Sequence, residues 1–98
     1  MNIQQTRNGN ELVVALEGRL DTVTAPELEA ALKDALEGVE ELILDFEKLD
    51  YISSAGLRVL LVAQKTMSQQ GSMKIRNVNE IIREVFDVTG FSDFLTIE

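Results

Sequence analysis

Two kinds of hydrophobic spacing follow one another along the chain, one repeating every second residue and one with the period of a helix. The first kind opens the sequence, where apolar residues alternate with their neighbours from Leu12 to Leu16. An Asn8-Gly9 pair precedes them, and both residue types tolerate the positive φ of a tight turn. Residues 1–18 are therefore predicted to form a β-hairpin.

Clear start and stop signals bracket the first helical pattern. Thr24 is a good N-cap residue, and Glu27 completes a capping box. Pro26 falls in the first turn, where its missing N–H costs little, and Gly38 is expected to be the C′ residue that ends the helix. The apolar residues at helical spacing are Leu28, Ala31, Leu32, Ala35 and Leu36. This stripe predicts an amphipathic helix packed on the core rather than a partner groove.

A strand and a second helix follow. Glu41 to Phe46 contains consecutive apolar residues, which is typical of a strand covered on both faces or of a central parallel strand. The next helix is predicted from about Ser54 to Gln69 and ends at Gly71. Because it is almost continuously apolar, it should be largely buried. A strand, a helix and another strand in this order favour a βαβ unit with a right-handed crossover.

The rest of the chain predicts a short strand, a third helix and a closing segment. The strand covers Met73–Asn77, and Asn79 can cap a helix that runs through about Val88 and stops at Gly90. A last short strand is expected among the apolar residues that close the core, which are Phe91, Phe94, Leu95 and Ile97. The order β-β-α-β-α-β-α-β predicts an α/β sandwich with a mostly parallel sheet, in one domain that spans residues 1–98.

Composition narrows the kinds of partner. The formal net charge of -8, from 17 acidic and 9 basic residues, argues against a nucleic-acid surface and against docking on anionic lipid. A basic protein surface is the natural complement. No stretch approaches the roughly 20 apolar residues of a membrane span, and no secretory signal is visible. We therefore expect no nucleic-acid partner, no membrane insertion and a cytoplasmic location.

Residues that carry enzymatic chemistry are scarce. The chain has neither Cys nor His, so its serines lack the usual base for nucleophilic catalysis, although a Lys base remains formally possible. Asp45, Glu47 and Asp50 form an acidic cluster of the kind that can bind Mg²⁺. No phosphate-cradling glycine loop accompanies them, and we interpret them as a solvated loop after the third strand. We expect a binding protein without a cofactor, a metal or catalytic activity.

The most informative stretch joins the third strand to the second helix, where Ser53 and Ser54 precede Gly56. The first N–H groups of a helix lack intrahelical partners, and the helix dipole adds positive charge there. A phosphate on either serine would therefore be well accommodated. The simpler interpretation is that a serine only caps the helix. Gly56 either lets another backbone approach closely or only allows the helix to pack on the sheet.

Three segments of the chain carry a family resemblance. They are Tyr51-Ile52-Ser53-Ser54-Ala55-Gly56-Leu57-Arg58-Val59-Leu60-Leu61, the run from Gly18-Arg19-Leu20-Asp21-Thr22 to Thr24-Ala25-Pro26-Glu27-Leu28, and Val85-Phe86-Asp87-Val88-Thr89-Gly90-Phe91. In their order along the chain, these segments resemble the STAS domain family, in particular the bacterial anti-sigma factor antagonists. The resemblance implies a STAS-like sandwich with a mixed, mostly parallel sheet of about four or five strands and three main helices.

The resemblance also implies a partner-switching function. The unphosphorylated domain would bind an anti-sigma factor that is also a serine kinase, and this would free a sigma factor for transcription. Phosphorylation of a serine at the start of the second helix would release the complex, and a PP2C-type phosphatase would reset the switch. The alternative is a STAS scaffold subunit of a transport or signalling assembly that is not phosphorylated.

Candidate site residues follow from the same resemblance. Ser54 aligns with the serine of the Asp-Ser pair of many relatives, so it is the first choice as phosphoacceptor and Ser53 is the second. Ser53 replaces the acid of that pair, and Ala55 stands where some relatives carry the modified hydroxyl. The implied partner-binding residues are Asp21, Thr22, Thr24, Ser53, Ser54, Gly56 and Arg58. Asp21 would help to dock the kinase or only cap its own loop, and Arg58 would be a partner contact or an ordinary surface base.

Overall fold

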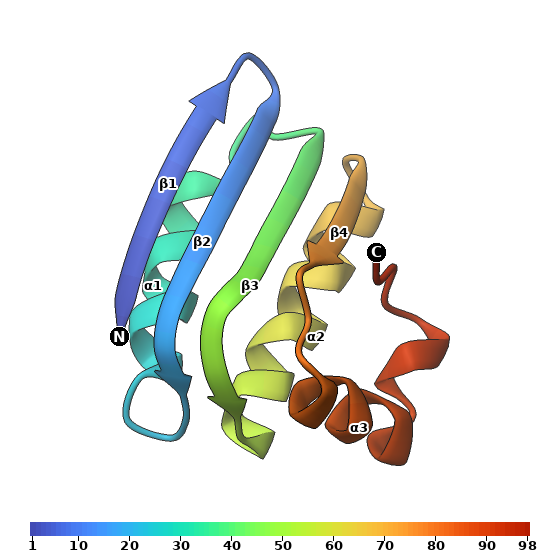
Figure 1. Ribbon diagram of the computed structural model, residues 1–98. Coiled ribbons are helices and arrows are strands. Elements are labelled where there is room, and N and C mark those ends of the chain that lie inside the picture. Colours follow the sequence, from blue (N-terminus) through green and yellow to red (C-terminus); the bar gives the residue numbers. More distant parts are fainter.

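The computed structural model describes residues 1–98 and contains one four-stranded sheet with three main helices (Figure 1). In chain order the elements are β1 (Asn2–Asn8), β2 (Glu11–Leu20), α1 (Ala25–Ala35), β3 (Glu41–Ile52), α2 (Ser54–Ser68), β4 (Ser72–Arg76), α3 (Glu80–Thr89) and a 3-10 helix, η1 (Phe91–Asp93). The strand order is β1-β2-β3-β4, with β1 antiparallel to β2 and the other pairs parallel. The predicted α/β class and mostly parallel sheet are confirmed.

The closing strand that the sequence predicted is reduced to one bridge. Ile97 pairs with Ile75 in parallel, and two backbone hydrogen bonds hold it there, from Ile75 N to the Thr96 carbonyl at 2.9 Å and from Glu98 N to the Ile75 carbonyl at 2.8 Å. Leu95 is buried, whereas Phe94 is 41% exposed and does not close the core. The segment is too short to continue the ladder beyond this point.

The opening hairpin forms as predicted, but its turn lies one residue later. Asn8 remains paired with Glu11, so the two loop residues are Gly9 and Asn10. Only Gly9 has a positive φ, at 64°. The prediction of an Asn8-Gly9 turn is therefore wrong by one position, because the ladder extends one pair further than the alternation of β2 indicated. Strand β2 also continues beyond Gly18, to Leu20.

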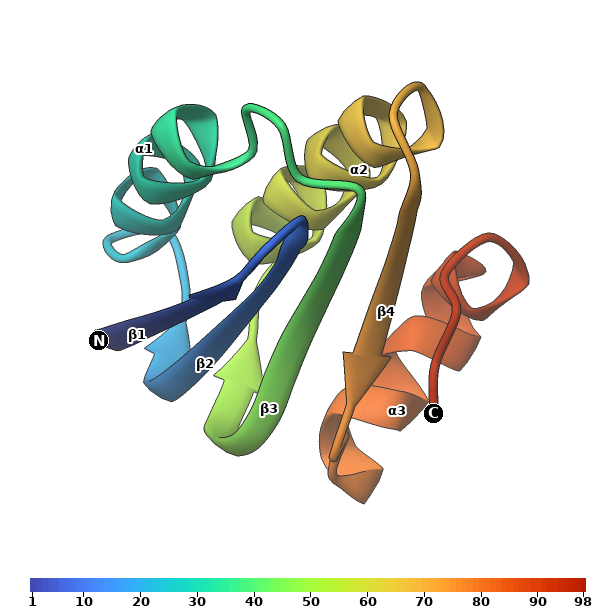
Figure 2. The ribbon, with the colours of Figure 1, turned by 90° about the horizontal axis from the view of Figure 1, so that it is seen from above.

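The core lies between the sheet and helices α1 and α2, which run side by side over one of its faces (Figure 2). Alternate residues of β2 and β3 point into this layer, and all residues that are buried in the protein are apolar or glycine. Burial of apolar surface is the main stabilising term in such a layer. Strand β3 is the central parallel strand that one of the two interpretations predicted, since it pairs in parallel with β2 and with β4. Its second face is not fully covered, because Ile43 is only partly buried between the buried Leu42 and Leu44.

Strand β3 continues six residues beyond the predicted end at Phe46, to Ile52. Its pairing with β2 is interrupted twice over this length. Compared with its partner β2, strand β3 has one extra, unpaired residue near Phe46 and another near Leu49. Each bulge shifts the alternation by one position, and the buried residues Phe46, Leu49 and Ile52 are consequently three apart. A strict alternation rule stops at the first bulge, which explains why the sequence pattern ended the strand there.

The acidic cluster consequently lies on a strand and not in the loop that the sequence predicted. Asp45 pairs with Ala15 and with Arg76 across the sheet, and Glu47 and Asp50 occupy the two bulged regions of β3. The Asp45 carboxylate accepts a hydrogen bond from Asn77 Nδ2 at 3.0 Å and another from the Glu47 backbone N–H at 3.0 Å. Desolvation by burial is the largest single influence and acts to raise the pKa of this carboxyl. The hydrogen bonds from Asn77, the Glu47 N–H and Arg76, together with the charge of Arg76, outweigh it and lower the pKa.

Helix α1 begins after Thr24, as predicted, but without the capping box. The Thr24 hydroxyl accepts a hydrogen bond from the Asp21 N–H at 2.8 Å and donates to the Arg19 carbonyl at 2.7 Å, so it does not cap the helix. Pro26 lies in the first turn. The C-cap of the helix is Leu36, so Gly38, with φ of 76°, lies one residue beyond the predicted C′ position. The hydroxyl has turned toward the preceding strand because that backbone comes close in the fold.

Helices α2 and α3 match their predicted limits closely. Helix α2 is less buried than predicted, since Val62 is 52% exposed. Helix α3 follows Asn79, whose side chain accepts a hydrogen bond from the Ile82 N–H at 2.8 Å, and it ends at Gly90 with φ of 82°. Both ends use local signals that need no tertiary partner. None of the helices is long and apolar enough to cross a membrane.

One side chain ties the ends of α1 and α2 together. The Gln70 amide donates to the Leu36 carbonyl and to the Val39 carbonyl, both at 2.6 Å. The carbonyls at the end of a helix have no intrahelical partner. Gln70 therefore supplies donors that α1 itself cannot provide.

Replacing Gln70 with Ala should lower the free energy of unfolding by about 1 kcal/mol or more, because it removes both hydrogen bonds and leaves the Leu36 carbonyl with only the Val39 N–H as donor. Chemical denaturation of the variant and the parent measures the difference. Gln69→Ala is the matched control, since the exposed Gln69 side chain makes no hydrogen bond within the protein. Equal losses for the two variants would contradict this role for Gln70.

Candidate functional site

Three segments meet at one end of the sheet, beyond the carboxyl ends of β2 and β3 (Figure 1). They are the loop between β2 and α1, the start of α2 and helix α3. The Ser53 N–H donates to the Leu20 carbonyl at 2.9 Å, which joins the first two segments directly. The fold thus brings the serine pair next to the loop that contains Asp21, Thr22 and Thr24.

The two serines have different environments. Ser53 is the N-cap of α2, with extended backbone, and its hydroxyl accepts a hydrogen bond from the Gly56 N–H at 3.5 Å. Ser54 is the first residue of the helix and is exposed, and its hydroxyl has no hydrogen-bond partner in the protein. The simpler interpretation of the turn therefore describes Ser53, whereas the Ser54 hydroxyl is free to react.

No acidic residue lies in the first turn of α2. The free N–H groups and the helix dipole therefore keep their positive potential at this end. An added anion on Ser54 would be stabilised by that potential, whereas an acidic side chain in the same turn would have cancelled part of it.

Gly56 is buried and allows α2 to start against the sheet. A Cβ atom at this position would lie 2.7 Å from Leu20 Cγ and 2.8 Å from Ile52 Cγ1. Both distances are shorter than carbon atoms tolerate, so only glycine fits without movement. Its burial and these short distances support the interpretation in which Gly56 allows the helix to pack on the sheet.

The Asp21 carboxylate organises its own loop. Asp21 Oδ1 accepts from the Val23 N–H at 3.0 Å and from the Thr24 N–H at 3.1 Å. The backbone hydrogen bond from Thr24 is the largest influence on this carboxyl and lowers its pKa, with support from the Val23 N–H, the Thr24 hydroxyl and Arg19 against a smaller opposing effect of desolvation. The local capping that the sequence allowed for Asp21 is thus present in the structure.

Two features of this surface escaped the sequence analysis. Arg19 lies over the ring of Tyr51, with its guanidinium carbon 4.4 Å from the ring centroid, and its Nε is 3.9 Å from Asp21 Oδ2. Val23 is 81% exposed in the loop before α1. An apolar residue among polar neighbours was the available signal for Val23. Arg19 and Tyr51 meet only because β2 and β3 place them in register.

Of the predicted contact residues, Thr22, Ser54 and Arg58 are exposed, and Asp21, Thr24 and Ser53 are partly buried. Arg58 follows Ser54 by four residues on α2 and takes part in no salt bridge. No group of acidic side chains is arranged to hold a metal ion.

Comparison with known proteins assigns the family. The family model for the STAS domain matches residues 2–98, and the chain belongs to this family. A curated relative from Bordetella bronchiseptica, the putative anti-sigma factor antagonist BtrV, is 37% identical, with 93% of this chain and 80% of the relative covered. The anti-sigma-B factor antagonist of Bacillus subtilis is 31% identical, with 99% of this chain and 90% of that protein covered.

The fold is also that of a solved member of this class. The structure of the Bacillus cell fate determinant SpoIIAA in its phosphorylated form superimposes with a TM-score of 0.77, at 22% sequence identity, and the match covers 99% of this chain and 91% of that one. At this level of identity the likeness concerns the fold alone.

Gly56→Ala should destabilise the protein by about 1–3 kcal/mol, because the new methyl group displaces Leu20 or Ile52 from its packed position. Ser54→Ala, two residues earlier on the exposed side of the same turn, should change the free energy of unfolding by no more than about 0.5 kcal/mol. Urea denaturation of both variants provides the test. A neutral Gly56→Ala would show that the helix start is not tightly packed.

Asp21→Asn should lower stability at neutral pH and have no effect in strong acid. The folded protein holds the pKa of Asp21 below its ordinary value of 3.8, so the ionised carboxylate stabilises the fold above that value. This contribution disappears as the pH falls through the folded-state pKa. Thermal unfolding of variant and parent across the acid range measures the change, with the exposed Asp50→Asn as control. A pH-independent difference would contradict an ionised cap.

Proposed function

We propose that this chain acts as an anti-sigma factor antagonist, and that Ser54 is the residue through which its binding is switched off. The observation that carries the proposal is the free, exposed Ser54 hydroxyl at the start of α2, beside a neighbouring serine that already serves as the cap. Two curated relatives that match nearly the whole chain are named as antagonists of this kind. In this proposal the chain acts as one STAS domain in the cytoplasm and has no catalytic activity of its own.

The partner would be an anti-sigma factor that is also a serine kinase. It would contact the exposed surface around the serine pair, which includes Thr22, Val23 and Arg58 and the accessible parts of Asp21, Thr24 and Ser53. A kinase must place the acceptor hydroxyl in its own active site, and Ser54 meets that requirement because no other group competes for its hydroxyl. A PP2C-type phosphatase would restore the unmodified form.

Release follows from electrostatics at a packed interface. A phosphoryl group adds about -1.5 to -2 charges at pH 7, and burying this charge against a partner surface that offers it no counter-ion costs several kcal/mol. Each 1.4 kcal/mol is a tenfold change in affinity. The antagonist itself would change little, because the modified residue is exposed and the core beneath it is apolar. Phosphorylation would therefore dissociate the complex without unfolding either component.

A STAS scaffold that is never phosphorylated remains the second candidate. The observation that favours it is that the residue capping the helix, Ser53, is neutral, whereas many relatives have an acid at this position. Complex formation without any phosphoryl transfer would select this function.

Incubation with ATP and the anti-sigma factor kinase of the same organism should add one phosphoryl group to the chain. Intact mass measures the gain. Ser54→Ala should abolish it, because the free acceptor hydroxyl is lost, whereas Ser53→Ala should retain it at a cost of about 1 kcal/mol in stability from the lost cap. A gain that survives in Ser54→Ala and disappears in Ser53→Ala would move the acceptor to Ser53.

Ser54→Asp should weaken binding of the anti-sigma factor about a hundredfold, which corresponds to two steps of 1.4 kcal/mol, while the melting temperature hardly changes. Ser54→Asn is the matched control, because it has nearly the same shape without the charge and should bind much more tightly than Ser54→Asp. Calorimetric titration of the three proteins measures the affinities. Equal binding of the Asp variant and the parent would count against an electrostatic switch.

A further inference from the structure

Arg58 is an exposed cation without an ion-pair partner close to the proposed phosphoacceptor. The salt bridges of the protein involve Arg19, Lys74 and Arg76, and Arg58 is in none of them. Arg19, on the neighbouring strand β2, is held by Asp21 and by the ring of Tyr51. Near the serine pair, Arg58 therefore differs from Arg19 in having no group that already occupies its guanidinium.

Helix geometry places Ser54 and Arg58 together. Both lie in the regular α-helix α2, and residues four apart on a helix are neighbours on one face, with Cβ atoms about 5–6 Å apart. The favourable order has the anion nearer the helix N-terminus and the cation four residues later. A phosphate on Ser54 and the guanidinium of Arg58 have this order, and a guanidinium can bind phosphate through two parallel hydrogen bonds.

We propose that Arg58 is the internal counter-ion of phosphorylated Ser54. This inference rests on the proposed phosphorylation and adds a second change to it. In the unmodified protein the guanidinium is free and exposed beside a neutral hydroxyl. In the modified protein it closes on the phosphate, so that one modification alters two side chains of the surface that the partner meets.

The charges near the start of α2 explain why a pair between Arg58 and the phosphate would matter. The chain has a net charge of -8, and the ionised Asp21 lies in the loop that is hydrogen-bonded to the start of α2. A dianion on Ser54 is added to this negative field, and Arg58 offsets it within the same helix. A partner whose acidic group pairs with Arg58 in the complex would lose that contact when the phosphate captures the guanidinium.

The pairing can be measured on the free protein by the second ionisation of the phosphate. Phosphoserine is installed at position 54 by genetic encoding, and phosphorus NMR follows the titration in three backgrounds: the parent, Arg58→Gln and Arg58→Lys. A nearby cation favours the dianion, so the pKa of the phosphate should be lowest in the parent and highest with Gln. The difference should shrink at high salt, because the pair is exposed.

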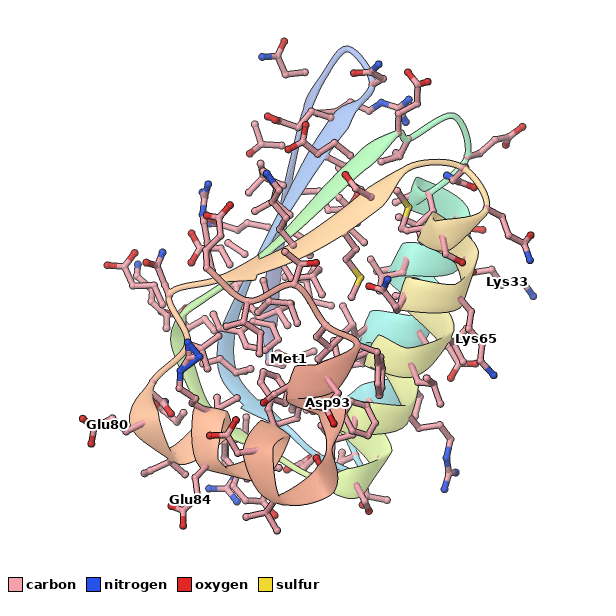
Figure 3. All side chains as sticks on the ribbon, turned by 90° about the vertical axis from the view of Figure 1, so that its right-hand side faces the viewer. Met1, Lys33, Lys65, Glu80, Glu84 and Asp93 are labelled. Carbon is pink, nitrogen blue, oxygen red and sulfur yellow. The ribbon has the colours of Figure 1, made fainter.

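Lys65→Gln provides the control on the same helix. Lys65 points outward from the last part of α2, away from the serine end (Figure 3). Its removal changes the net charge by the same amount as Arg58→Gln, and it should leave the phosphate pKa unchanged. A shift of equal size in both variants would mean that the phosphate senses only overall charge, and the specific pair would be refuted.

An identical phosphate pKa in the parent and in Arg58→Gln would also overturn the inference. Melting curves of the unphosphorylated variants confirm that each is folded, and Arg58→Lys retains the charge if the Gln variant is unstable. Because the phosphoserine is introduced without any kinase, this outcome is separate from the failure of the proposed function, which would appear as a chain that no anti-sigma factor kinase binds or modifies.

Discussion

The close packing of the first turn of α2 against the ends of β2 and β3 is the constraint on which the site depends. Gly56 makes the contact with Leu20 and Ile52 possible, and the hydrogen bond from Ser53 to the Leu20 carbonyl fixes the backbone next to it. Together they determine where the helix begins. The start of the helix in turn determines which serine becomes the cap and which is left exposed.

The chemistry of the site at the start of α2 follows from the different roles of the two serines. The Ser53 hydroxyl accepts a hydrogen bond from the Gly56 N–H, whereas the Ser54 hydroxyl, on the first residue of the helix, is exposed and lies in the positive potential of the helix N-terminus. Asp21 stabilises its own loop with backbone hydrogen bonds. Since the layer beneath contains only apolar side chains and glycine, charge can change at this surface without a cost to the core.

Much of this architecture could be predicted because its signals are local. Asn79 and Gly90 delimit α3 as their side-chain chemistry and backbone freedom require, and the apolar stripe of α1 packs on the core. The predictions failed where pairing with or bonding to a neighbouring strand set the environment of a group. Strand β3 extends beyond its predicted end because bulges opposite β2 break its hydrophobic alternation. The Thr24 hydroxyl donates to a backbone carbonyl of β2 instead of capping its own helix.

The sequence by itself determined the order of the elements, the two consecutive serines at a helix start and the acidic charge of the chain, since periodicity, capping residues and composition are properties of neighbouring positions. Only the tertiary structure decided that Ser53 is engaged and Ser54 is free, that Gly56 is buried, and that Arg19 lies on Tyr51. These outcomes depend on which strand ends meet the first turn of α2. Contacts between distant segments are set by sheet register and packing, which no local pattern encodes.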